Sequence, residues 1–238
     1  LVLFSLLYNT YCGLVRGGQI DDVAELVPDD CFLFVASRGA GDLFMEFSEL
    51  GSALSETGPN TRAAIEGMTD LSAEFLGFDP HAEADWAGSG VSLNHPIGYA
   101  TFDSVDALRG DALLLIPIGD QDALIQNVTK MVESLGGVVN LEEIPSRQIW
   151  ETHGAEMWGR SLNLAWILEG DYLVASLSLV EGFAPVPRLM SIYDEDQPSM
   201  LSKLDSFVQI SNSSSNDWHN FGYISTAGTE DYSSLMSR

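Results

Sequence analysis

Short apolar segments of two kinds predict the strands of this chain. Some are continuous apolar runs, typical of strands buried on both faces, and others alternate apolar with polar residues. The predicted strands lie at residues 31–36, 97–102, 112–118, 138–141, 148–152, 162–168, 172–178 and 221–225. Because Glu169-Gly170-Asp171 is a short connection between the sixth and seventh of these strands, we expect an antiparallel hairpin there.

Apolar residues at a spacing of three or four predict amphipathic helices between some of these strands. The clearest helix starts after Asp120, a residue type that caps helix N-termini, and ends before Gly136. Its apolar positions are Leu124, Ile125, Val128, Met131, Val132 and Leu135. Further helices are predicted at 43–54, after Asp42, at 65–76 and at 200–208.

These elements predict an α+β fold in which amphipathic helices pack on one face of antiparallel sheets. A unit of strand, polar turn and amphipathic helix occurs twice, at 31–54 and at 112–135. Such a repeated unit is typical of a split α+β layer, and it is either a duplication or two independent uses of one motif.

Changes in composition along the chain predict where its domain ends. Residues 181–198 contain Pro185, Pro187 and Pro198 together with an acidic run at 194–196, which is the composition of a linker. We therefore expect four regions. They are an apolar leader or membrane-anchor remnant at 1–19, the α+β domain at 20–180, a Pro-rich acidic linker at 181–198, and the start of a second module or a C-terminal extension at 199–238.

Residues 1–15 form an almost uncharged apolar stretch, LVLFSLLYNTYCGLV. Because about 20 such residues are needed to span a bilayer, the stretch matches the apolar core of a signal peptide or part of a membrane anchor. A buried strand or helix of the fold is the alternative. Cys12 and Cys31 are compatible with one disulfide in an oxidising compartment or with a buried free thiol at Cys31.

The chain carries 35 acidic residues against 10 lysines and arginines, for a formal net charge of −25. Because phosphate backbones and anionic lipid surfaces repel this charge, we expect no nucleic-acid partner and no attachment to an anionic membrane surface by charge. Only Lys130 and Lys203 are lysines, and a Lys-poor acidic surface suits high ionic strength. We therefore expect an extracytoplasmic location, in the periplasm or at the cell surface; an acidic surface that serves solubility alone is the alternative.

Three short motifs lie in the predicted α+β domain. They are Glu25-Leu26-Val27-Pro28-Asp29-Asp30 before an apolar strand, Leu76-Gly77-Phe78-Asp79-Pro80 after a helix, and Pro96-Ile97-Gly98-Tyr99 at a strand entry. In these motifs the chain resembles a family of uncharacterised exported bacterial envelope proteins and lipoproteins of unknown function, found in myxobacteria and their relatives. The resemblance implies export and a non-catalytic role. A lipid-attachment signature is missing, because Tyr11 precedes Cys12 where a small residue is needed.

One loop-like segment offers four metal-ligating side chains at alternate positions, Asp79, His81, Glu83 and Asp85. Ligands with this spacing converge on Ca²⁺ where the backbone curls. Ca²⁺ is the one cofactor for which the sequence offers candidate ligands. The segment lacks the central Gly and the distant Glu of the helix–loop–helix calcium motif, so a solvated acidic loop is the alternative.

The sequence contains no recognisable catalytic constellation. Gly88-Ser89-Gly90 lacks the frame of a nucleophile elbow, and the histidines are too scattered for a helical zinc site. Among the tryptophans, Trp86 and Trp218 fall in polar loops and are the predicted partner contacts.

These observations predict an exported envelope protein, not an enzyme, that acts as an interaction or scaffold subunit of a larger surface or membrane-bound assembly. Its expected partners are other envelope proteins or copies of itself, with anchoring through the N-terminal apolar stretch as one option. Two alternatives stay open. One is a calcium-stabilised binding module, and the other is a carboxylate- or metal-dependent hydrolase that acts on a cell-wall polymer.

Overall fold

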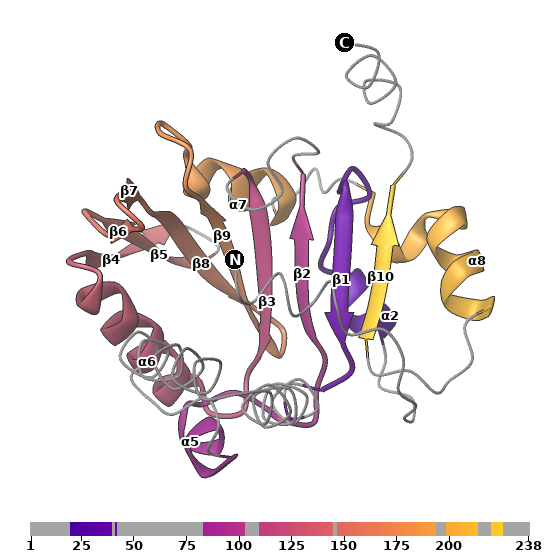
Figure 1. Ribbon diagram of the computed structural model, residues 1–238, viewed down its shortest axis with the longest axis horizontal. Helices are drawn as coiled ribbons and strands as arrows, with labels where there is room; N and C mark the ends of the chain where they lie inside the picture. The colour runs from indigo at the N-terminus through magenta and orange to yellow at the C-terminus, as the bar shows by residue number, and fades with distance from the viewer. Residues whose placement is uncertain are drawn as a thin grey trace, which may run out of the picture.

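The computed structural model describes residues 20–39, 41, 83–102, 110–144, 147–193, 199–213 and 220–225. Within these ranges an antiparallel eight-stranded sheet has the strand order β10-β1-β2-β3-β9-β8-β5-β4 (Figure 1). Its strands are β1 (Leu33–Ser37), β2 (Ile97–Thr101), β3 (Ala112–Pro117), β4 (Val138–Ile144), β5 (Arg147–His153), β8 (Asn163–Glu169), β9 (Tyr172–Ser178) and β10 (Asn220–Ile224). β6 (Glu156–Met157) and β7 (Arg160–Ser161) form a separate small ribbon.

Helices accompany the sheet, so the predicted α+β class is confirmed. The described helices are α2 (Ile20–Ala24), α5 (Glu83–Gly88), α6 (Gln121–Ser134), α7 (Pro185–Tyr193), the 3₁₀ turn η1 (Leu201–Lys203) and α8 (Asp205–Ser213). None of the helices in the described ranges is both long and apolar enough to cross a bilayer.

The sheet has a hydrophobic core on each face, because successive side chains of a strand point to opposite sides. On one face Ile149 and Ile167 pack with Leu189 of α7. On the other face Trp166 packs with Val132 of α6. The prediction of helices on one face was therefore wrong, and the reason is visible in the continuous apolar runs of β3, β8 and β9, which supply side chains to both cores.

Helix α6 has the boundaries that the sequence predicts. The Asp120 carboxylate accepts a hydrogen bond from the Ala123 backbone N–H over 3.1 Å, which satisfies one of the free donors of the first turn. The helix ends where Gly136 adopts a φ of 77°, a conformation that glycine reaches without steric strain. The predicted β8–β9 hairpin is likewise present, with Gly170 at a φ of 56° in its turn.

Residues 185–193 of the segment expected to be a linker are part of the core. Pro185 and Pro187 occupy the first turn of α7, where backbone N–H groups have no acceptor within the helix, so the prolines start this helix instead of breaking it. Leu189, Ile192 and Tyr193 of the same helix are buried. The predicted linker is therefore wrong over these residues.

The described part of the segment expected to begin a second module or to form a C-terminal extension completes the same sheet. β10 pairs antiparallel with β1, with Phe34 opposite Tyr223. Phe207 of α8 contacts the ring of Phe34, with the ring centroids 6.0 Å apart. Residues 199–213 and 220–225 thus belong to the fold of the preceding strands, which corrects the predicted boundary.

Several predicted features lie outside the described residues. These include the stretch 1–19 with Cys12, the helices predicted at 43–54 and 65–76, and the acidic run at 194–196 with Pro198. Cys31 is a buried free thiol. The first strands of the repeated unit are β1 and β3, which β2 separates in the sheet.

Candidate functional site

Trp158 is the most exposed large apolar side chain among the described residues, with 73% of its surface accessible. It occupies the two-residue turn between β6 and β7 together with Gly159, and both residues have positive φ, 54° and 70°. Two positive φ values are the mark of a type I′ hairpin turn, in which Asn or Gly is preferred. A tryptophan in this left-handed conformation costs about 1–2 kcal/mol, so the ring is presented to solvent at a real cost in stability.

The hairpin that carries Trp158 is fastened to the body of the fold. The Glu156 N–H donates to the carbonyl oxygen of Leu135, the residue that follows α6, over 3.1 Å. The Leu162 N–H donates to the Ala155 carbonyl oxygen over 2.9 Å and closes the base of the hairpin. Met157 packs against the core beneath α6. One side chain of the hairpin is therefore an anchor, and its neighbour Trp158 faces outward.

β4 is an edge strand of the sheet, and its exposed side chains include large apolar ones. Val138 is 61% exposed and Leu141 is 49% exposed. Leu141 lies opposite Trp150, which in turn lies opposite Trp166. The two indole rings are parallel, with centroids 6.3 Å apart and an interplanar angle of 2°. An apolar row that is buried in the middle of the sheet therefore ends in an exposed leucine.

Acidic residues accompany this apolar edge. Glu142 and Glu143 follow Leu141 along β4, and both are exposed. The β6–β7 hairpin lies at the same end of the sheet as β4 (Figure 1). We refer to Val138, Leu141, Glu142, Glu143 and Trp158 as the β4 edge surface.

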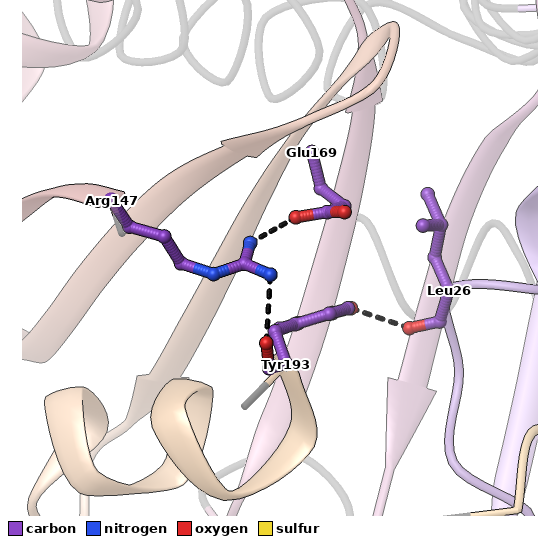
Figure 2. A network of polar contacts seen from close by, with 4 residues as sticks. All are labelled: Leu26, Arg147, Glu169 and Tyr193. Atoms are coloured by element: carbon purple, nitrogen blue, oxygen red, sulfur yellow. Dashed lines mark hydrogen bonds and ion pairs between the residues drawn. The ribbon is translucent and has the colours of Figure 1, made fainter. Parts of the chain in front are cut away.

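A polar cluster fixes the end of β5 next to this surface (Figure 2). Arg147 forms an ion pair with Glu169 and donates a hydrogen bond over 2.7 Å to the backbone oxygen of Tyr193. Its guanidinium lies 5.7 Å from the centroid of the Tyr193 ring. The Tyr193 hydroxyl donates to the Leu26 carbonyl oxygen over 2.5 Å. Burial, followed by the Glu169 charge, raises the pKa of Tyr193, so this hydroxyl stays a neutral donor.

The cysteine within the described residues is not suited to nucleophilic chemistry. Burial is the main reason why the pKa of Cys31 rises from 9.0 to about 12, and the charges of Asp30 and Asp29 add to it. A thiol with this pKa is almost wholly protonated at neutral pH, and the thiolate is the reactive form.

The structure describes half of the predicted calcium segment. Asp79 and His81 lie outside the described residues, while Glu83 and Asp85 belong to α5. A helical backbone at these two positions is not the curled loop that the prediction requires. Within the described ranges no three His, Cys, Asp or Glu side chains are grouped as metal ligands. The loop geometry assumed for Glu83 and Asp85 is therefore wrong.

The exposed tryptophan in the structure, Trp158, is not one of the two that the sequence predicts as partner contacts. Trp86 is half-buried on α5 and packs against the core beneath α6, and Trp218 lies outside the described residues. The sequence pattern does not single out Trp158, because strands of two residues are too short to produce a periodic pattern. The one available signal was the Trp158-Gly159 pair, since a Gly at the second position is typical of tight hairpins.

Comparison of the chain with protein-family models, with curated proteins and with solved structures found no match.

Proposed function

We propose that this protein is an exported, non-catalytic subunit of a larger cell-envelope assembly and that it contacts its partner through the β4 edge surface. The observation that carries the proposal is Trp158, which is 73% exposed and has a positive φ. Backbone conformations of this cost cluster at functional sites, and tryptophan is among the residue types that dominate binding energy at interfaces. A partner that buries the indole ring gives a physical reason for its place in the turn.

Features of the sequence support the proposed location outside the cytoplasm. The apolar stretch 1–15 has the character of an export signal or anchor, and the net charge of −25 with only two lysines suits a saline surrounding. The resemblance to exported envelope proteins supports the same location.

Site-specific photo-crosslinking in the native host tests the proposal. A photoreactive amino acid replaces Trp158 in one variant and Gln209, an exposed residue of α8, in a control variant. We expect a discrete crosslinked product in the envelope fraction for position 158 and none for position 209. Equal labelling at the two positions would contradict the proposed contact, and recovery of the chain in the cytoplasmic fraction would contradict the proposed location.

A further inference from the structure

We infer that β4 accepts an extended cationic segment of the partner as an added antiparallel strand. This inference rests on the proposed function, because it specifies the chemistry of the partner at the β4 edge surface. Strand addition uses the backbone groups of an open sheet edge for affinity and the alternating side chains for specificity.

The backbone of β4 is suited to such pairing. All seven residues of the strand are in continuous register with β5, from Val138 opposite His153 to Ile144 opposite Arg147. No described strand pairs with its other side. Natural sheets blunt their open edges with prolines, charged side chains (above all lysine), bulges or very short strands. The seven residues of β4 contain no proline, lysine or bulge, and their charged side chains are Glu142 and Glu143.

The apolar side chains of β4 define where an added strand gains hydrophobic contact. Leu141 ends the row that contains the stacked Trp150 and Trp166. An apolar residue placed opposite Leu141 would extend this row by one strand and bury the exposed part of the leucine.

The charges of β4 determine the kind of segment that fits. Glu142 and Glu143 point to opposite faces of the sheet, and within the described part of the chain neither has an ion-pair partner. Arg147, the nearest cation along the chain, is engaged with Glu169. An incoming strand with Lys or Arg opposite each glutamate gains a cross-strand ion pair on each face, and the net charge of −25 steers such a segment inward.

The same charges disfavour a second copy of the chain as the occupant. Two chains of net charge −25 repel each other, and cross-strand registers that bring the glutamates of both copies face to face add local repulsion. The pattern that complements β4 is two adjacent cationic residues followed by an apolar residue, read from the residue opposite Glu143 toward the residue opposite Leu141.

A charge-swap experiment with synthetic peptides tests the inference. The probe is a fluorescent peptide with the core Thr-Lys-Arg-Val-Thr-Val-Thr, and its acidic counterpart has Glu in place of Lys and Arg. Binding is measured by anisotropy for the unmodified chain, for the double variant Glu142→Lys/Glu143→Lys, and for the control Glu25→Lys/Glu181→Lys. The control changes the net charge equally at exposed residues outside β4.

We expect the unmodified chain and the control to bind the cationic peptide, and the β4 variant to lose at least about tenfold in affinity while it gains affinity for the acidic peptide. Bound peptide should slow hydrogen exchange of the β4 amides. An equal loss in both variants would show a net-charge effect and overturn the inference. Binding without protection of β4 would overturn the added strand.

The remaining outcomes separate this inference from the proposed function. A dimer of the unmodified chain that the β4 variant abolishes would identify a second copy as the occupant and overturn the cationic segment. A crosslink at position 158 without any binding of the cationic peptide would leave the proposed function standing and refute the strand addition. Absence of both would refute the two together.

Discussion

The Tyr193 hydroxyl and the Leu26 carbonyl oxygen are joined by a 2.5 Å hydrogen bond across 167 positions of the chain. The backbone oxygen of the same tyrosine accepts a hydrogen bond from Arg147. Arg147 lies opposite Ile144, the last residue of β4. One residue at the end of α7 therefore connects the N-terminal segment to the strand pair that forms the β4 edge (Figure 2).

Tyr193→Phe removes the hydroxyl and leaves the Leu26 carbonyl without this donor. We expect the free energy of unfolding to fall by about 1–2 kcal/mol, because a partly buried acceptor that loses its partner bears a cost of desolvation. Urea unfolding followed by tryptophan fluorescence measures the change.

Tyr172→Phe is the matched control for this substitution. The Tyr172 hydroxyl is buried and, in the described part of the chain, has no hydrogen-bond partner. Its removal should change the free energy of unfolding by less than about 0.5 kcal/mol, or stabilise the fold slightly. Equal destabilisation by both substitutions would show that the Tyr193 hydrogen bond has no special role.

Trp158→Asn should stabilise the isolated protein by about 1 kcal/mol, because Asn-Gly suits two positive φ values and tryptophan does not. Trp158→Ala keeps the backbone strain and should be less stable than the Asn variant. Thermal unfolding of the three proteins gives the comparison. Destabilisation by Asn would mean that the indole ring is a packing residue, which would remove the basis for its role as a partner contact.

Gly98→Ala should destabilise the fold by about 1–3 kcal/mol. A Cβ atom at Gly98 would lie 2.5 Å from the Val23 side chain, so α2 could no longer approach β2 as closely. Gly222→Ala, in β10, is the control, because a Cβ there would meet no atom within 4 Å. We expect that variant to be neutral or more stable in chemical denaturation, and similar losses at both glycines would contradict the close packing of α2.

Stability should fall as the pH rises above about 9. The pKa of Cys31 rises from 9.0 to about 12 on folding and that of Tyr172 from 10.0 to about 12, in both cases chiefly through burial. At a pH between the unfolded-state pKa and the folded-state pKa of each group, the unfolded chain has released a proton that the native chain retains. The free energy of unfolding therefore decreases, by up to about 1.4 kcal/mol per pH unit for each group.

Cys31→Ala separates the contribution of the thiol from that of the buried tyrosines, Tyr172 among them. In this variant the decrease should begin near pH 10, where tyrosine starts to titrate in the unfolded chain, and not near pH 9. Unfolding curves collected from pH 8 to pH 12 on both proteins measure the difference. Identical pH profiles would show that the Cys31 thiol does not contribute.

Sequence signals that act between neighbouring residues correctly predict helix ends and strands. Asp120 and Gly136 delimit α6, because a capping carboxylate and a left-handed glycine act on adjacent backbone groups. The apolar runs around Leu113 and Val174 became β3 and β9 for a similarly local reason, since side-chain alternation and burial are properties of each strand.

The candidate site was harder to predict than the strands. Trp86 lies in a polar stretch of the sequence yet packs against the core, while Trp158 lies between two strands of two residues each and is exposed. Exposure depends on which distant segments cover a side chain, and residue order alone does not record that.

The sequence by itself determined the α+β composition, the acidic charge and the boundaries of α6 and of the β8–β9 hairpin, because propensity, capping and net charge act within one segment or sum over the chain. Only the tertiary structure decided that α7 belongs to the core, that β10 pairs with β1 and that β4 is an edge. These outcomes depend on the hydrophobic burial and backbone pairing of segments far apart in the chain, which compete with one another and are settled together when the sheet forms.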